Sequence, residues 1–396
     1  MTAKIMRRLK KLLELKTFRR AYSKASKASP LDGNKILLIS DVRKVLDGNL
    51  KCIGDYMDGR GYEIRVLCRD RQRDGLTAGD IEEIAYEMAT AGYVFMEDVL
   101  SFMDAVEVRE GQNFIQLWHA AGAFKKFGFS RLQNERGIRI SSGYRKYTHV
   151  SSSAEEIRAN YAEAFGIDIK KVQAKGIPRT DLFFDENAKA ACLQELYTEY
   201  PILENRRLLL FAPTYRGARP AEAHYDFSRI DPQRVAEKLR AVNGAMGRGE
   251  KKYLFAVKWH PAMVSSGAVE EFAGQLAGKE DTIADLSQLR DADRLLPAAD
   301  VLITDYSSVT FDYALLDRPI VYYPWDLEAY YNGRSFYYPF EEYVYGAVTD
   351  DLDSMLDAAI EGKMMPEQRQ AFRKKFVGAC DGRSTEKICR WIFGEL

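Results

Sequence analysis

The sequence predicts an α/β protein with two doubly wound domains, each a parallel sheet covered by helices on both faces. Three observations predict this fold. Short apolar, β-branched runs alternate with helical stretches, which is typical of parallel strands joined by crossover helices. The length of 396 residues fits two domains of roughly 150–200 residues. A new strand pattern at residues 206–211, after a helical stretch at 186–203, starts the second domain.

Composition limits the class of protein. Hydrophobic residues make up 46% of the chain, which is enough for two packed cores. The formal net charge is zero, which argues against nucleic acid as the main partner. Five scattered cysteines without metal-ligand spacing predict a reducing compartment and no metal site. No apolar run is long enough for a transmembrane helix, and the amino terminus lacks the apolar core of a signal peptide.

Residues 1–29 form a strongly basic segment, with ten Lys and Arg against the single acidic residue Glu14. Its apolar side chains fall mostly on one side of a helix: Ile5, Met6, Leu9, Leu12, Leu13 and Phe18. A basic amphipathic helix of this kind can lie in the headgroup layer of an anionic membrane. A solvated basic tail, or a helix packed on the first domain, explains the pattern equally well.

The first domain is expected at residues 30–190, the second at 191–375, and a last segment at 376–396. Strands are predicted in the first domain at residues 35–40, 62–68, 92–97, 113–119, 148–152 and 172–176, and helices at 49–58, 78–91 and 154–165. No Gly-x-Gly-x-x-Gly follows the first strand, which argues against an ordinary dinucleotide site. The last segment should begin a helix at Ser384 or Thr385 that packs back across the two domains.

His119 ends a predicted strand in the stretch QLWHAAGAFKKFG at residues 116–128. Ligands of open α/β sheets bind outside the carboxyl ends of the strands, and imidazole suits the removal of a hydroxyl proton. Taken alone, a histidine after Trp118 is more often a packed or capping residue. Lys125 is a candidate contact for acceptor phosphates, with a solvated loop as the alternative. Arg179, in GIPRTD at 176–181, is a candidate phosphate or acceptor contact, with a structural ion pair as the alternative.

Two strand ends in the second domain carry further candidates. In APTYR at residues 212–216, Pro213 stiffens the exit from the strand and directs Thr214 and Arg216 toward the ligand side. The planar guanidinium of Arg216 can clamp a diphosphate. In KWHP at residues 258–261, Lys258 and His260 stand at the end of the next strand, where His260 without context is more often structural.

The stretch LITDYSS at residues 302–308 reads as a buried strand and a polar turn that opens a helix. Ser307 and Ser308 stand where the helix should begin, and Val309, Tyr313 and Leu316 should form its inward face. The free amides and positive dipole end of such a helix suit a phosphate, although ordinary capping serines are the simpler explanation. Asp305 is expected to hold His260 or a tyrosine, or to touch a ribose.

These motifs together resemble the CDP-glycerol glycerophosphotransferase family, which builds teichoic acids and related capsular polymers from CDP-activated polyols. The resemblance rests on LITDYSS, FDYALLDRP at 311–319, the segment around His119, GIPRTD, APTYR, the His-Pro at 260–261 and DGRST at 381–385. It implies a GT-B architecture, two Rossmann-like domains that face one crevice. Ala120 departs from the glycine that many members carry, and Lys258 replaces an arginine expected two positions earlier.

The resemblance also implies an activity and roles for individual residues. His119 would remove the proton of an acceptor hydroxyl, which attacks the β-phosphorus of the CDP-polyol and releases CMP. His260, Arg216, Ser307 and Ser308 would surround the diphosphate, and no metal or other cofactor is expected. Glycerol phosphate is the first choice of polyol phosphate; a CDP-ribitol enzyme or a capsule polymerase is the alternative within the family.

The implied partners are a CDP-glycerol or CDP-ribitol donor and a saccharide acceptor linked to a lipid of the undecaprenyl diphosphate type. Such an enzyme would work as a peripheral protein on the cytoplasmic face of the cell membrane, held through residues 1–29; a homo-oligomer is compatible with the sequence. Alternatives outside the family are a GT-B glycosyltransferase that uses a nucleotide sugar, a noncatalytic nucleotide-binding scaffold at the membrane, and a sugar epimerase of the same fold.

Overall fold

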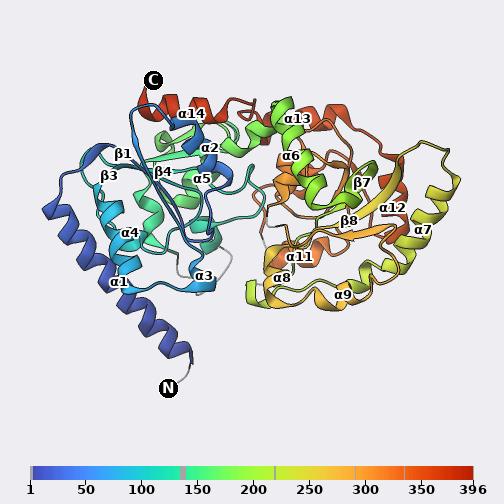
Figure 1. The fold of residues 1–396 in the computed structure, drawn as a ribbon, viewed down its shortest axis with the longest axis horizontal. Helices are drawn as coiled ribbons and strands as arrows, with labels where there is room; N and C mark the ends of the chain where they lie inside the picture. The colour runs from blue at the N-terminus through green and yellow to red at the C-terminus, as the bar shows by residue number, and fades with distance from the viewer. Residues whose placement is uncertain (1–2, 134–139, 218–219, 290, 334, 396) are drawn as a thin grey trace. The chain divides into compact units, whose positions relative to one another are not determined.

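A computed structural model describes residues 3–133, 140–217, 220–289, 291–333 and 335–395 (Figure 1). The chain divides into two compact units, each described by itself. Unit 1 contains Met1–Ala121, Phe127–Asp181 and Gly378–Leu396, and unit 2 contains Gly122–Lys126 and Leu182–Val377. Each unit holds a six-stranded parallel sheet with helices, which confirms the predicted α/β class.

The sheet of unit 1 has the strand order β2-β1-β3-β4-β5-β6, with every neighbouring pair parallel. Its strands are β1 (Asp32–Ser40), β2 (Glu63–Cys68), β3 (Ala91–Met96), β4 (Asn113–Gln116), β5 (His149–Ser152) and β6 (Val172–Ala174). All six predicted strands are present, although β4 ends three residues before His119. The order reverses between β1 and β3, so the carboxyl ends of these two strands flank the position where ligands of such sheets bind.

Helices cover both faces of this sheet. The helices of unit 1 are α1 (Ala3–Ala28), α2 (Gly48–Met57), α3 (Arg71–Asp74), α4 (Ala78–Thr90), α5 (Arg158–Phe165) and α14 (Ser384–Phe393). Apolar residues of α2 and α14 pack with Ile36, Phe95 and Ile115 of the sheet in one buried cluster. Helix α4 packs on β1 and β3, and α1 packs on α4. The last helix begins at Ser384, as predicted.

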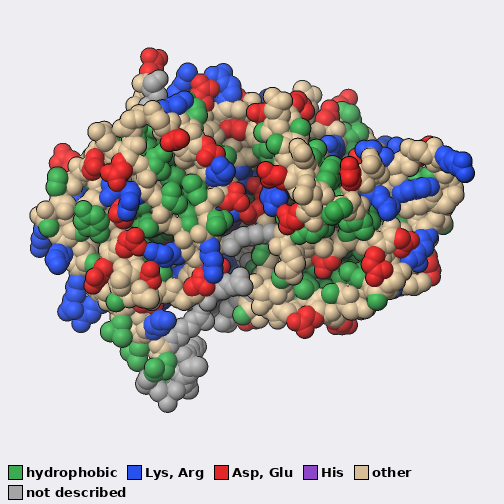
Figure 2. Space-filling view, in the orientation of Figure 1, with side chains coloured by type: hydrophobic (Ala, Val, Ile, Leu, Met, Phe, Trp, Pro, Cys, Tyr) green, Lys and Arg blue, Asp and Glu red, His purple; other side chains and the backbone are tan. Residues whose placement is uncertain are grey.

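Helix α1 is attached along its second half and exposed along its first half. Phe18 and Tyr22 are buried, and the Phe18 ring stacks on Phe102 with ring centres 4.6 Å apart. Glu14 pairs with Arg71 of α3. Toward the amino terminus the hydrophobic side chains are 45–64% exposed: Ile5, Met6, Leu9, Leu12 and Leu13 (Figure 2). The predicted helix is therefore confirmed. No helix in the described part of the chain combines the length and apolarity needed to cross a bilayer.

The sheet of unit 2 has the order β12-β11-β10-β7-β8-β9, again parallel throughout. Its strands are β7 (Arg206–Phe211), β8 (Lys252–Val257), β9 (Ile283–Asp285), β10 (Ala299–Thr304), β11 (Ile320–Tyr322) and β12 (Ala347–Val348). The first strand of the unit, β7, lies in the middle, and the order reverses between β7 and β10. The loops after these two strands therefore flank the ligand position of a doubly wound sheet.

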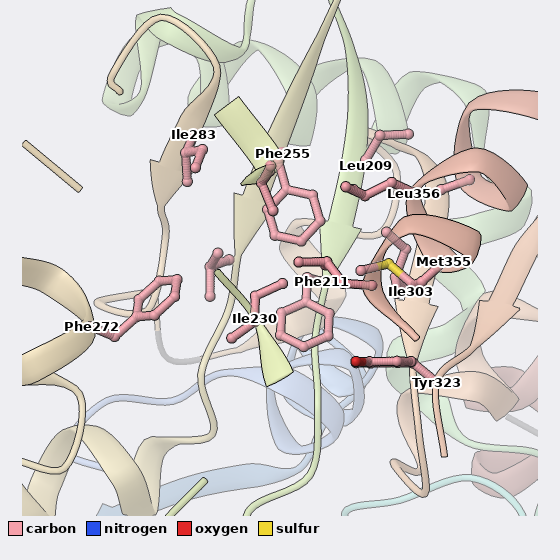
Figure 3. Packing of buried hydrophobic residues seen from close by; sticks show 14 of the residues in the cluster. Leu209, Phe211, Ile230, Phe255, Phe272, Ile283, Ile303, Tyr323, Met355 and Leu356 are labelled. Carbon is pink, nitrogen blue, oxygen red and sulfur yellow. The ribbon is translucent and has the colours of Figure 1, made fainter. Parts of the chain in front are cut away.

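The helices of unit 2 are α6 (Glu186–Glu199), α7 (Pro232–Ala245), α8 (Pro261–Ser266), α9 (Glu270–Gly274), α10 (Val309–Tyr313), α11 (Leu327–Gly333), α12 (Leu352–Glu361) and α13 (Pro366–Val377). Side chains of β7, β8 and β10 interdigitate with Met355 and Leu356 of α12 and with Ile230, which precedes α7 (Figure 3). This buried layer fixes the strands whose carboxyl ends carry the candidate residues.

The helix expected after Ser308 is shorter than predicted and is not amphipathic. It covers only Val309–Tyr313, and all five residues are buried. Its two polar residues, Thr310 and Asp312, are buried with the others, so the helix has no solvated polar face of the kind that an amphipathic helix needs. Leu316 follows in a turn, so the predicted inward face of Val309, Tyr313 and Leu316 is not the face of one helix.

Asp181 fastens the last helix to unit 1. Its carboxylate accepts hydrogen bonds from the amides of Ser384 and Thr385 at 2.8 Å each and from the Thr385 hydroxyl at 2.7 Å. Two motifs of the sequence, GIPRTD and DGRST, therefore meet at the start of α14. A carboxylate at a helix start satisfies amides that have no partner within the helix.

We expect Asp181→Ala to lower the free energy of unfolding by about 2 kcal/mol, because three hydrogen bonds to this partly buried helix start are lost. Urea denaturation measures the change. Asp351→Ala is the matched control, since Asp351 accepts one amide hydrogen bond at the exposed start of α12. That control should cost about 1 kcal/mol or less. Equal losses in the two variants would contradict the special role of Asp181.

Candidate active site

The loops at the reversal point of unit 2 are joined by one buried carboxylate. Asp305, directly after β10, is 1% exposed. One of its oxygens accepts the amides of Thr214, at 2.8 Å, and of Tyr306, at 2.6 Å. The other oxygen accepts Nη1 of Arg216 at 2.7 Å. The predicted residues Thr214, Arg216 and Asp305 are therefore brought together. Of the alternatives expected for Asp305, the contact with a tyrosine is made through the Tyr306 amide, and the contact with a ribose stays a prediction.

The guanidinium of Arg216 is held by two carboxylates and lies among aromatic rings. Its Nε and Nη2 donate to the two oxygens of Asp326 at 2.7 and 2.6 Å, a bidentate ion pair. Four aromatic rings surround the guanidinium at 5.0–5.3 Å: Tyr225, Tyr306, Trp325 and Tyr330. A buried cation requires such partners. The diphosphate clamp predicted for Arg216 stays a prediction, and the observed contacts give this side chain a structural role first.

Lys125 lies in unit 2, although His119 lies in unit 1. Its Nζ is 3.4 Å from the Thr214 hydroxyl and 5.3 Å from the centre of the Tyr330 ring. The segment 122–126 is anchored by Phe124, whose ring stacks on Tyr343 with ring centres 4.1 Å apart. This position places Lys125 beside the group around Asp305, and its contact with acceptor phosphates stays a prediction.

Ser307 and Ser308 follow Asp305 and are partly exposed. The Ser307 hydroxyl accepts the Val309 amide at 3.4 Å, and the Ser308 side chain caps no amide of α10. The two hydroxyls are thus at the carboxyl end of β10, as predicted. Their contact with a phosphate stays a prediction.

His260 stands at the start of α8 and is exposed. Its Nδ1 accepts the Ala262 amide at 3.1 Å, and its ring lies against Tyr215 with centres 4.7 Å apart. Because Nδ1 accepts this hydrogen bond, the proton of the neutral ring is on Nε2. His260 can therefore donate to an anion, but the observed contacts also make it a capping residue.

Lys258, two residues before His260, is 4% exposed, and its Nζ donates to the Trp259 carbonyl oxygen at 3.1 Å. Burial lowers the pKa of its amine to about 8, and the carboxylates of Asp291 and Asp285 only partly oppose this shift. An anionic ligand next to this amine would favour its charged form and so raise its pKa.

In unit 1, the imidazole of His119 is 48% exposed and pairs with a carboxylate that the sequence analysis missed. Its Nδ1 lies 2.9 Å from Oδ1 of Asp98, whose side chain is 21% exposed. The surrounding protein displaces water and so lowers the pKa of His119, but the hydrogen bond and charge of Asp98 raise it more, with help from Glu97. The net pKa shift is upward. Asp98 follows β3 as His119 follows β4, and this strand-end position was the available signal.

The turn before His119 is held by two buried side-chain amides, those of Gln116 and Asn49. Trp118 has a φ of 59°, a left-handed conformation that is rare for a bulky residue. Its amide donates to Oε1 of Gln116 at 2.8 Å, and its carbonyl accepts Nδ2 of Asn49 at 2.8 Å. Oδ1 of Asn49 also accepts the amide of Arg179 at 3.0 Å. Gln116 begins the stretch around His119 that the sequence analysis quoted, but it was given no role there, and Asn49 lies outside every motif used.

Arg179 lies beside His119. Its Nη2 donates to the His119 carbonyl oxygen at 3.3 Å, and its positive charge lowers the pKa of that imidazole. The guanidinium therefore lies near the candidate base, and contact with a phosphate or acceptor stays a prediction. Across the residues that the structure describes, no cluster of three or more His, Cys, Asp or Glu has metal-site geometry.

The pKa of Lys258 gives a test of the buried charge. Its amine loses a proton near pH 8 in the folded chain and near pH 10.4 in the unfolded chain. Between these values unfolding takes up a proton, so the wild type gains stability as pH rises. Lys258→Met removes that gain. We expect its stability relative to the wild type to fall by up to roughly 3 kcal/mol from pH 7 to pH 10.5.

Urea denaturation at several pH values measures this change. Lys251→Met, at an exposed lysine, is the matched control. The difference between its free energy of unfolding and that of the wild type should be the same at each pH. A constant difference for Lys258→Met as well would show that its charge is not buried.

The chain is similar in sequence to known teichoic acid polymerases and primases. The chain is 35% identical over 362 residues to a teichoic acid poly(ribitol-phosphate) polymerase of Bacillus spizizenii, an alignment that covers 91% of this chain and 56% of that protein. The chain thus spans little more than half the length of this relative. It is 30% identical over 387 residues to a teichoic acid ribitol-phosphate primase of the same organism, with 95% of both chains covered.

A solved structure of the wall teichoic acid polymerase TagF matches with a TM-score of 0.73 at 19% identity, and the match covers 98% of this chain and 96% of that one. This likeness shows a fold of the GT-B type, as predicted. The family model described as CDP-Glycerol:Poly(glycerophosphate) glycerophosphotransferase matches residues 21–394. The chain therefore belongs to the CDP-glycerol:poly(glycerophosphate) glycerophosphotransferase family.

Proposed function

We propose that this protein transfers a polyol phosphate from a CDP-polyol to a hydroxyl group of a teichoic acid precursor and releases CMP. Family membership supports the reaction class. The observation that carries the proposal is the exposed imidazole of His119, which stands at the carboxyl end of β4 with its Nδ1 on a carboxylate. Such a histidine can take a proton from a hydroxyl near neutral pH.

In the proposed reaction, the acceptor hydroxyl gives its proton to His119 while its oxygen bonds to the β-phosphorus of the donor. The bond between that phosphorus and the bridging oxygen breaks, and the bridging oxygen leaves with CMP. Transfer at phosphorus depends on positioning and on neutralising charge. In unit 2, Lys125, Lys258, His260 and the two serines after Asp305 are the groups suited to the diphosphate.

Ribitol phosphate is the polyol phosphate that we propose to test first. The two relatives described above carry ribitol phosphate in their names, whereas the family description names glycerophosphate. This reverses the order expected from the sequence alone, where glycerol phosphate stood first. The choice of polyol is tested by the assay with both CDP-polyols.

A membrane-bound acceptor would suit the geometry of α1. The middle of this helix contacts loops at the carboxyl edge of the unit 1 sheet, through Phe18 on Phe102 and Glu14 on Arg71. The exposed turns before Glu14 therefore extend from the side of unit 1 where α3 lies (Figure 1). We propose that these turns hold the protein on the cytoplasmic face of an anionic membrane. A lipid-linked acceptor in that membrane would then lie near His119.

The activity is tested by incubating the protein separately with CDP-ribitol, CDP-glycerol and a UDP-sugar, with a lipid-linked saccharide acceptor, with and without a chelator. We expect CMP release with a CDP-polyol. His119→Gln should lower kcat by about 10²- to 10⁴-fold, because the base is lost. His149→Gln is the matched control: that histidine packs against Trp391 in the same unit and should leave kcat within about twofold.

Release of UDP instead of CMP would favour a nucleotide-sugar glycosyltransferase, and conversion of the free UDP-sugar would favour an epimerase. Nucleotide binding without turnover would favour a scaffold. Full activity of His119→Gln would contradict the assignment of the base while leaving the reaction itself in place.

The membrane proposal predicts that Leu12→Glu with Leu13→Glu weakens binding to vesicles that contain anionic lipid. Both side chains are exposed, at 55% and 64%, so folding should be unaffected. Losing two buried leucines on a membrane corresponds to about 3 kcal/mol, or a roughly 100-fold weaker partition. Vesicle sedimentation measures it. Val108→Glu, at an exposed apolar residue elsewhere in unit 1, is the control. Equal binding of all proteins would contradict the proposal.

A further inference from the structure

The carboxylate of Asp98 contacts the imidazole of His119, and Asp98 lies outside the sequence motifs. We propose that Asp98 is a positioning residue, whose carboxylate accepts the Nδ1 proton of His119 and so makes Nε2 the nitrogen that takes the acceptor proton. This inference rests on the proposed function, because that function supplies the hydroxyl. Asp98 touches the imidazole and not the reacting atoms.

The contact fixes the ring from two sides. The distance from Nδ1 to Oδ1 of Asp98 is 2.9 Å, within the range of a hydrogen bond. One face of the imidazole lies on the Trp118 indole, with ring centres 4.4 Å apart and planes inclined by 32°. A ring held at Nδ1 and along one face has one remaining basic atom, Nε2. The His119 side chain is 48% exposed, so the imidazole as a whole is not enclosed by the protein.

The carboxylate and the imidazole are also joined through the backbone. Nε2 of Gln116 donates to the carbonyl oxygen of Asp98 at 3.2 Å, while its Oε1 accepts the amide of Trp118 at 2.8 Å. Gln116 is fully buried, so the two loops cannot separate without leaving its amide unpaired. The left-handed Trp118 costs about 1–3 kcal/mol, and such strain persists only where the surroundings fix it.

The charges around the imidazole favour this arrangement. Asp98 and Glu97 come from the end of β3, and Glu97 is buried and paired with Arg43 at 2.5 Å. Arg179 opposes them. The groups around the pair are therefore one further carboxylate, that of Glu97, the guanidiniums of Arg43 and Arg179, and the phenol of Tyr144. Burial raises the pKa of Tyr144, the charge of Arg131 opposes this shift, and the charge of Asp98 adds to it. Removing the charge of Asp98 leaves a site in which the imidazole is easier to deprotonate.

The test compares Asp98→Asn and Asp98→Glu with the wild type in the CMP-release assay from pH 5 to pH 9. For Asp98→Asn we expect kcat to fall 10- to 1,000-fold, the acidic limb of the kcat profile to move to lower pH, and KM for the donor to stay within twofold. Asp98→Glu keeps the charge and should recover part of kcat and the position of the limb. A merely structural loss would lower activity at every pH without moving the limb.

Asp104→Asn is the matched control. Asp104 lies in the same unit and accepts hydrogen bonds at 2.8 Å from Ser141, Ser142 and Gly143, away from His119. It should lower the melting temperature and leave the acidic limb in place. A limb that shifts equally in Asp104→Asn and Asp98→Asn would overturn the inference.

A spectroscopic readout separates this inference from the proposed function. In ¹⁵N-labelled protein, long-range ¹H–¹⁵N correlation spectra report which ring nitrogen of His119 carries the proton. We expect the Nδ1–H form in the wild type and in Asp98→Glu, and a mixture in Asp98→Asn. The same Nδ1–H form in Asp98→Asn would overturn the inference. Absence of CMP release in the wild type would instead overturn the proposed function, while the spectra still decide the role of Asp98.

Discussion

The constraint on which unit 2 depends is the pairing of a buried cation with two carboxylates. Arg216 lies between Asp305, which is 1% exposed, and Asp326. Removing one partner of such a pair typically costs 3–5 kcal/mol, because it leaves a buried charge without compensation. The pairing therefore holds the ends of β7 and β10 and the start of α11 as one piece. Thr214 and the two serines are placed by that piece, since the same carboxylate also accepts the Thr214 amide.

In unit 1, the loop that carries His119 is held by hydrogen bonds to neutral side chains. The loops that carry His119 and Arg179 are tied by the neutral side chains Gln116 and Asn49. A neutral amide satisfies backbone groups without adding charge beside an imidazole. The charge of the neighbouring carboxylate can then set the protonation of His119 without competition from the groups that hold the backbone.

The sequence predicted what depends on local pattern. Strand runs such as the one after Lys35 are set by neighbouring residues and are observed where expected. The helix start at Ser384 was also predicted, but its fixation by Asp181, 203 positions away, was not. The contacts of Arg216 were not predictable in the same way, because Asp326 is 110 positions away and no spacing rule connects them. The short helix after Ser308 was misjudged because its apolar positions are buried on every side. Asp98 was within reach, since it stands at the end of a predicted strand.

The small residues after His119 have a packing explanation that the sequence alone did not suggest. The chain passes from unit 1 to unit 2 between Ala121 and Gly122 and returns after Lys126. Gly122 has a φ of 70°, and a Cβ there would lie 2.3 Å from the Phe311 ring. Only glycine fits so close a contact in that conformation. The motif that contains both His119 and Lys125 therefore serves two units: its first part carries the candidate base, and its second part supplies a cation beside Thr214.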